Sequence, residues 1–124
     1  NIVEAVQCGA ARIGHGIALR GHPVDIAVLK ECGTGIEMCP VSNLQTKAVQ
    51  SKDDYPLREF IDRGLLVTLN TDNRTVSNTT IGKEIDFVQE NCGITDEEIV
   101  EIQKNAVKVA FASDEVKEKL FKRL

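Results

Sequence analysis

The segment Leu65–Leu69 is a short, almost continuously apolar run between Gly64 and the polar stretch Asn70–Asn78. A half-exposed antiparallel strand alternates apolar and polar residues, whereas a strand covered on both faces does not. Strands of the second kind belong to parallel sheets flanked by helices. The run therefore predicts an α/β fold with a parallel sheet, and it constrains the architecture more than any other feature of the chain.

Two further segments are predicted to be strands of the same sheet, Ala11–Gly14 and Gly35–Cys39. A helix is expected after each, because Pro23 and Pro56 suit a first helical turn and apolar residues follow at helical spacing. The intervening segment Val41–Asp54 is predicted to be a polar loop. The expected apolar faces of these two helices are Val24, Ala27 and Val28 in the first, and Leu57, Phe60 and Ile61 in the second.

Three strand-to-helix units in series, followed by further helices and without repeat or linker, predict a single domain over residues 1–124. Two architectures fit this order: a doubly wound open sheet, or a sector of a (β/α)₈ barrel. A typical barrel has roughly 250 residues, so the second would be incomplete at this length. The first of the final three helices is marked by the stripe Ile81, Ile85 and Val88, and the last by the cap Ser113. The middle one opens with the capping box of Thr95 and Glu98, and its expected apolar face is Ile99, Ile102, Ala106 and Val109.

Composition narrows the classes of function. With 19 acidic and 15 basic residues, the chain has a net charge of −4 and no general attraction to nucleic acid or to an anionic membrane. No apolar run approaches the roughly 20 residues of a membrane-spanning helix, so a cytoplasmic protein is expected. The four cysteines form no C-x-x-C pair and are expected to be reduced thiols, mostly buried. An enzyme or a small-molecule binder remains.

Polar residues follow each predicted strand at its carboxyl end, where ligands of parallel sheets bind. The first strand leads to His15, the second to Ser42 and Asn43, and the third to Asp72 and Asn73. An imidazole and a carboxylate that converge on one edge are what acid–base or metal chemistry requires. This edge is therefore the candidate site.

Three strings at these strand ends carry a family resemblance: RIGHGIAL (12–19), EMCPVSNLQT (37–46) and TLNTDNRTVSNTT (68–80). They resemble, in order, the last three strand ends of the adenosine deaminase family. Members are zinc-dependent (β/α)₈ barrels of purine salvage that hydrolyse the 6-amino group of adenosine or deoxyadenosine, giving inosine or deoxyinosine and ammonia. The resemblance covers the whole chain, but only the carboxyl-terminal part of the family's barrel.

The resemblance implies roles for three residues. His15 corresponds to the histidine that orients and helps to deprotonate the attacking water. Asp72 corresponds to the aspartate that binds zinc and contacts the same water, which suits an anionic oxygen donor. Asn73 stands where many members have a second aspartate that bonds a purine ring nitrogen, so its amide is the implied substrate contact.

Other zinc ligands of the family are absent from this sequence. Neither the H-x-H pair nor the H-A-G-E segment occurs, and His22, directly before Pro23, is better explained as an exposed turn residue. A catalytic zinc site needs about three protein ligands plus water. The chain alone is therefore expected to bind zinc weakly or not at all and to be inactive, and an amino-terminal barrel fragment or self-association is expected to complete it.

Two other functions fit parts of the pattern. One is a deaminase for another aminopurine, such as adenine or AMP. The other is a non-catalytic, flavodoxin-like binding module of about this length. A phosphoacceptor receiver of that fold would carry acidic residues at the first strand end, where this chain has His15.

Overall fold

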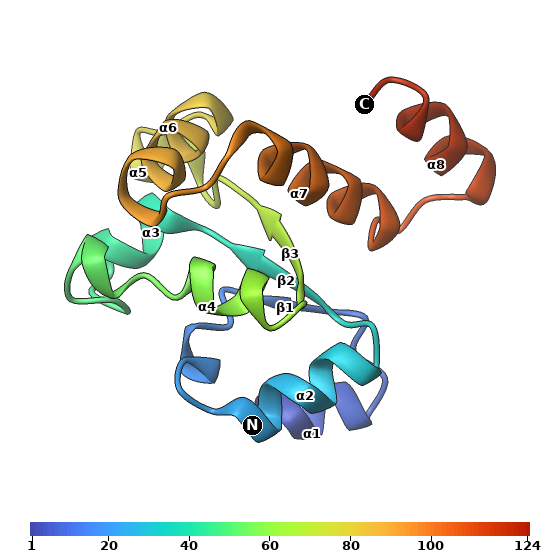
Figure 1. Cartoon of the computed structure of the whole chain (residues 1–124), viewed down its shortest axis with the longest axis horizontal. Helices are drawn as coiled ribbons and strands as arrows, with labels where there is room; N and C mark the ends of the chain where they lie inside the picture. Colours follow the sequence, from blue (N-terminus) through green and yellow to red (C-terminus); the bar gives the residue numbers. More distant parts are fainter.

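A computed structural model describes the whole chain, residues 1–124, as one three-stranded parallel sheet with helices packed around it (Figure 1). The strands are β1 (Arg12–Gly14), β2 (Gly35–Met38) and β3 (Leu66–Leu69), and β2 lies between the other two. Ile36 is paired with Ile13 on one side and with Val67 on the other. The predicted α/β class with parallel strands is confirmed.

The helices begin and end largely where their caps indicate. Pro23 occupies the first turn of its helix, Thr95 and Glu98 form the predicted capping box, and the Ser113 hydroxyl accepts from the backbone of Val116. The α-helices are α1 (Ile2–Gln7), α2 (Pro23–Glu31), α3 (Pro40–Gln45), α4 (Leu57–Asp62), α5 (Arg74–Ser77), α6 (Ile81–Cys92), α7 (Asp96–Lys108) and α8 (Asp114–Phe121), and the 3₁₀ turns are η1 (Ile17–Leu19) and η2 (Lys52–Asp54).

The layers of the fold follow chain order. In Figure 1, α1 and α2 lie together on one side of the sheet, α7 runs along β3, and α8 projects away from the sheet. Gly35 in β2 permits the end of α7 to approach, because a Cβ there would lie 2.9 Å from the side chain of Val109. The carboxyl ends of all three strands are left at one edge, where the polar residues gather.

The segment after β2 differs from its prediction as a loop. Pro40 opens the short helix α3, and η2 follows it. The Thr46 hydroxyl donates to the carbonyl of Ser42 and helps to close α3. The helix escaped prediction because it has no apolar stripe: it buries Ser42 and Asn43 rather than aliphatic residues. The polar stretch Asn70–Asn78 likewise contains a short helix, α5.

The apolar core lies mainly between the sheet and α2, α4, α6 and α7. Two predicted helix faces are wrong in detail. In α2, Ile26 and Leu29 are buried while Val24 is 75% exposed, because the larger side chains take the positions against the sheet. In α7, Val107 rather than Ala106 is buried. The core members with the least exposure are Leu29, Ile36, Met38, Leu57, Phe60, Val67 and Val88.

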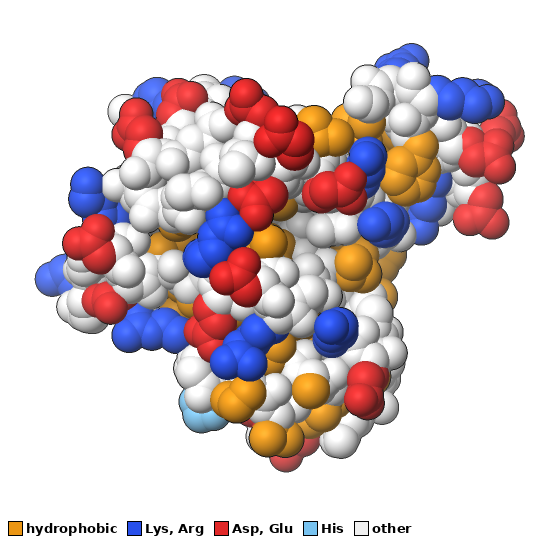
Figure 2. Space-filling view, in the orientation of Figure 1, with side chains coloured by type: hydrophobic (Ala, Val, Ile, Leu, Met, Phe, Trp, Pro, Cys, Tyr) orange, Lys and Arg blue, Asp and Glu red, His pale blue; other side chains and the backbone are white.

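The cysteines and the surface refine the compositional predictions. All four thiols are free, but Cys8 and Cys32 are exposed, so the expectation of mostly buried cysteines is wrong for these two. Both lie at or beside the carboxyl ends of surface helices. Acidic and basic side chains are interspersed on the face seen in Figure 2. None of the helices has the length and apolar character needed to cross a membrane.

Candidate active site

The carboxyl edge of the sheet brings together residues from all three strand ends. His15 follows β1 directly, Ser42 and Asn43 lie in α3 just after β2, and Asp72 follows β3. The His15 Nε2 atom lies 3.9 Å from Asp72 Oδ2. The two side chains are 47% and 42% exposed, so both remain open to a ligand. Two residues 57 positions apart in sequence thus share one site.

The backbone of both residues adopts the left-handed conformation, with φ of 63° at His15 and 55° at Asp72. This conformation is uncommon outside glycine and is concentrated at functional sites. The His15 amide donates to the Glu37 carbonyl at 2.8 Å, which continues the sheet pairing past β1. Gly16 follows at φ 65°, and a Cβ there would lie 2.9 Å from Ile36 Cγ2. The turn after β1 is therefore specified closely.

Hydrogen bonds from α3 hold both side chains. The Ser42 hydroxyl donates to Asp72 Oδ2 at 2.7 Å. The Asn43 amide nitrogen lies 3.0 Å from His15 Nδ1, and the buried Tyr55 hydroxyl donates to Asn43 Oδ1 at 3.1 Å. Burial raises the pKa of Tyr55 well above its usual value, so the phenol stays protonated. The orientation of His15 and Asp72 is thus set within this chain.

The buried carboxylate of Glu84 connects α3 to the segment that precedes α6. Glu84 of α6 is fully buried, and its two oxygens accept from the Val41 amide at 3.1 Å and from the Thr79 hydroxyl at 2.7 Å. It therefore joins the first turn of α3 to the chain that enters α6. Sequence reasoning missed Glu84, although it lies three residues after Ile81 and so interrupts a predicted apolar stripe.

The electrostatic surroundings of the site are negative. Burial, and then the nearby charges of Asp72, Glu84 and Glu37, raise the pKa of Cys39 to about 12. A thiol with such a pKa is not a nucleophile near neutral pH. Glu37 already pairs with Arg12 at 3.1 Å, so Asp72 and Glu84 are the carboxylates that favour a cation at this edge. Cys39 is therefore a structural residue beside a site that suits positive charge.

The residues present supply part of a zinc site. Asp72 offers an exposed carboxylate oxygen, a donor type that zinc accepts. Nowhere do three His, Cys, Asp or Glu side chains come together as a metal-binding group. His22 lies exposed at the start of α2 and makes no capping hydrogen bond. Asp72 thus fits as one ligand of a site whose other ligands this chain does not bring to it.

Asn73 lies beside Asp72 and is exposed, but half of its amide is already used. Its Oδ1 accepts from the backbone of Thr75 at 3.1 Å and of Val76 at 3.0 Å, which caps α5. The amide NH₂ has no such role. Any contact of Asn73 with a ligand is therefore restricted to donation, unless the cap is broken.

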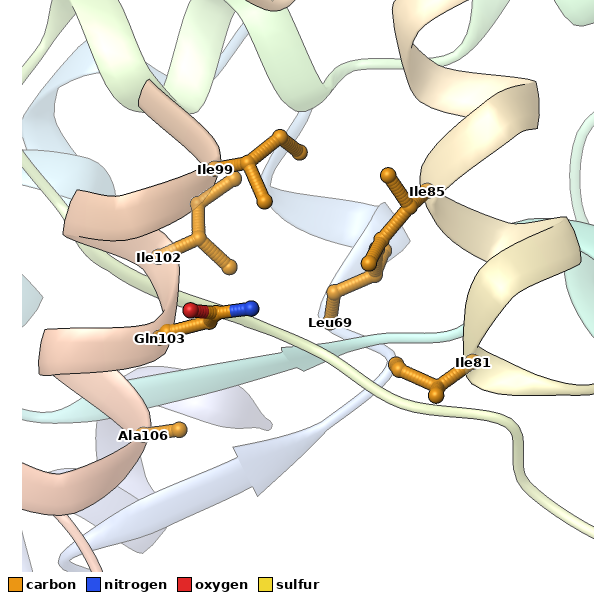
Figure 3. A pocket seen from close by; sticks show the side chains of 7 residues that line it. All are labelled: Leu69, Ile81, Ile85, Ile99, Ile102, Gln103 and Ala106. Atoms are coloured by element: carbon orange, nitrogen blue, oxygen red, sulfur yellow. The ribbon is translucent and has the colours of Figure 1, made fainter. Parts of the chain in front are cut away.

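Two hollows flank the end of β3. A polar pocket of about 330 Å³ is formed by Asn70, Thr71, Arg74 and Thr80 together with Leu69 and Ile81. An apolar pocket of about 260 Å³ lies between α6 and α7, whose side chains face one another across Leu69 (Figure 3). Neither His15 nor Asp72 lines it. The apolar pocket is formed by Leu69, Ile81, Ile85, Ile99, Ile102, Gln103 and Ala106.

Comparison with known proteins gives a consistent result. The sequence profile of the family described as adenosine deaminase matches residues 1–124. Over 121 residues the chain is 48% identical to the adenosine deaminase of Vibrio atlanticus (strain LGP32). This alignment covers 97% of this chain and 36% of that protein. The chain thus spans little more than a third of the length of the curated relatives it matches.

Solved structures match over the same extent. The adenine deaminase of Arthrobacter aurescens superposes with a TM-score of 0.90 at 26% identity, over 98% of this chain and 37% of that one. An amidohydrolase from Burkholderia ambifaria, solved with bound zinc, superposes with a TM-score of 0.87 at 20% identity. This superposition covers 98% of this chain and 34% of that one. The chain is therefore α/β, with three parallel strands that form part of an incomplete (β/α)₈ barrel.

Proposed function

We propose, from the premise that the chain belongs to the adenosine deaminase family, that it supplies one active-site edge of an enzyme that deaminates adenosine or deoxyadenosine. In that reaction water adds at C6 of the purine and ammonia leaves, which gives inosine or deoxyinosine. The observation that carries the proposal is the convergence of His15 and Asp72, 3.9 Å apart, from two different strand ends.

Each residue of the edge has a proposed task. Asp72 would hold zinc as one of its ligands, with Ser42 donating to the same carboxylate and fixing its direction. Zinc, when bound, supplies a Lewis acid that makes water a better nucleophile near neutral pH. His15 orients the attacking water, and one of the two groups, the His15 imidazole or the Asp72 carboxylate, takes up its proton. Asn73, whose oxygen caps α5, binds the substrate by donating from its NH₂ to a ring nitrogen of the purine.

The rest of the barrel is the proposed partner, because residues 1–124 form only a partial domain. The relatives extend well beyond the matched region, and β3 pairs with β2 alone, which leaves its other edge open. An unpaired edge beside an apolar pocket invites association. We assign this surface to the amino-terminal part of a deaminase barrel, which would also supply the missing zinc ligands.

A deaminase for adenine or AMP is the second candidate. The superposition on an adenine deaminase favours it, with a TM-score of 0.90. The 48% identity to an adenosine deaminase favours the nucleoside. A non-catalytic module has no comparable support, because it gives no reason for two left-handed residues to hold an imidazole and a carboxylate together. Four free thiols suit the reducing cytoplasm, the proposed location.

A two-part assay tests the proposal. The chain is mixed with the portion of the Vibrio atlanticus enzyme that it does not match, in the presence of zinc, and is offered adenosine, deoxyadenosine, adenine and AMP separately. We expect deamination only in the mixture, and fastest with the nucleosides. Preference for adenine or AMP would support the second candidate. Deamination by the 124-residue chain alone would contradict the assignment of a partial site.

A further inference from the structure

The hydrogen bonds behind His15 determine which of its ring nitrogens carries the proton. A neutral imidazole has one N–H, and its position is set by the partner of the other nitrogen. His15 Nδ1 lies 3.0 Å from the side-chain amide nitrogen of Asn43 in α3, while Nε2 faces Asp72. The question is whether Asn43 presents its NH₂ or its oxygen to the ring.

Tyr55 answers that question. Its side chain is buried, and its hydroxyl has one proton to donate, which goes to Asn43 Oδ1 at 3.1 Å. If the Asn43 amide were reversed, the phenol proton would face an NH₂ group and lose its acceptor. A buried donor without an acceptor is destabilising, so the amide is held with its oxygen toward Tyr55.

We propose that Asn43, oriented by Tyr55, is a positioning residue that keeps neutral His15 in the tautomer with its proton on Nε2. The Asn43 NH₂ donates to Nδ1, so Nδ1 is an acceptor and the proton lies on the other nitrogen. That nitrogen is the one that faces Asp72. The ring therefore presents an N–H to the site, not a lone pair.

This placement divides the tasks of the proposed function, on which its catalytic meaning rests. An imidazole that presents Nε2–H donates to the attacking water and holds it in place. It has no lone pair there with which to take the water's proton. Proton uptake then falls to Asp72, whose carboxylate is an acceptor held by Ser42. His15 is thus assigned the orienting task and Asp72 the task of the base.

Nitrogen-15 NMR tests the proton position without any activity measurement. The chain has only two histidines, so labelling the imidazoles gives two ring spin systems, and a His22→Gln variant assigns them. Spectra are recorded near pH 8.5, about two units above the pKa of a free imidazole, and the tautomer is taken from the neutral-ring signals. His22 is exposed and makes no capping hydrogen bond, so it reports an unconstrained tautomer mixture.

We expect His15 to show Nε2–H over Nδ1–H by at least about tenfold, the ratio that one net hydrogen bond of ~1.4 kcal/mol supports. Asn43→Asp offers Nδ1 only an acceptor, so it should move the proton to Nδ1. Tyr55→Phe should leave the amide free to turn and give a mixture. Asn78→Asp adds the same charge at an exposed position and should leave His15 unchanged. Circular dichroism checks that each variant is folded.

Three results would overturn the proposal: Nδ1–H in the unmodified chain, the same mixture at His15 as at His22, or no response of His15 to Asn43→Asp. None of these bears on whether the two-part enzyme deaminates adenosine. Conversely, an ordered Nε2–H in a mixture that fails to deaminate would uphold the proton position and reject the proposed function. The two failures are therefore distinguishable.

Discussion

The polar carboxyl edge and the apolar pocket both adjoin the end of β3, yet they differ in how complete they are. At the edge, Ser42 and Asn43 already satisfy Asp72 and His15 by hydrogen bonds within the chain. In the pocket, six of the seven lining residues are hydrophobic, and β3, whose last residue lines it, pairs with β2 alone. The comparison shows that orientation of the reacting groups is internal to this chain, whereas closure of the barrel depends on another segment.

Removal of the carboxylate at the edge should have the largest effect. Asp72→Ala takes away the zinc ligand and the acceptor for the water's proton, so we expect kcat/KM of the two-part enzyme to fall about 10⁴-fold, as when other catalytic units lose a member. Asp86→Ala, at an exposed position of α6, is the matched control. If kcat/KM of the Asp72→Ala enzyme stayed within tenfold of the unmodified value, Asp72 would have no catalytic role.

Truncation in the core should lower stability without touching the edge. Phe60 is fully buried in α4, so Phe60→Ala should lower the free energy of unfolding by about 3–5 kcal/mol in urea titrations. The proton position of His15, read by NMR under conditions where the variant is folded, should not move. If the proton does move, the orientation of His15 is not determined by its hydrogen bond to α3 alone.

A charge placed in the pocket should weaken association and leave the chain folded. Ala106 lines the pocket and is exposed, so Ala106→Glu should weaken binding of the remaining barrel at least about tenfold, because the carboxylate must be desolvated there. Calorimetric titration measures the affinity. Ala18→Glu, exposed on η1, is the control. Equal affinities for the two variants would show that the pocket is not the covered surface.

The left-handed backbone at the edge should be visible as a small stability difference. An alanine at φ 63° keeps the strain that a glycine relieves, so His15→Gly should be more stable to unfolding than His15→Ala by about 1 kcal/mol. At Asp25, a helical position of α2, the same pair of variants should show the opposite order. Greater stability of His15→Ala would mean that the strand-end turn is unstrained.

The smallest expected effect concerns the ion pair of Arg58 and Glu98, neither of which lines the edge or the apolar pocket. Arg58 binds Glu98 at 2.6 and 2.8 Å and lowers the pKa of Glu98 to about 2. Because this pKa is lower in the folded state, the ion pair stabilises the fold fully at a pH above about 4.5, the pKa of the unfolded chain. That stabilisation is lost as the pH falls from about 4.5 to about 2. Glu98→Gln should therefore cost about 0.5 kcal/mol at pH 7 and almost nothing at pH 2. A constant difference across this range would exclude the charge as its cause.

The sequence predicts those parts of the fold whose signals are local in the chain. The strands and most helices carry apolar periodicity or local caps, and Leu65–Leu69 or Thr95 with Glu98 can be recognised within a few residues. The contacts that hold α3 have no such signal, because Tyr55 lies 12 residues from Asn43 and Glu84 lies 43 residues from Val41. His15 and Asp72 could be singled out through a family resemblance, but the scaffold that orients them required the structure.

The most direct measurement is made on a single-chain hybrid, in which this chain replaces the matched 36% of the Vibrio atlanticus enzyme. Its initial rate of inosine formation from adenosine is measured with zinc present. If the chain carries a complete carboxyl edge, kcat/KM should lie within about tenfold of the parent enzyme, a difference of 1.4 kcal/mol or less. A folded hybrid that binds zinc but forms no inosine would contradict the proposed function.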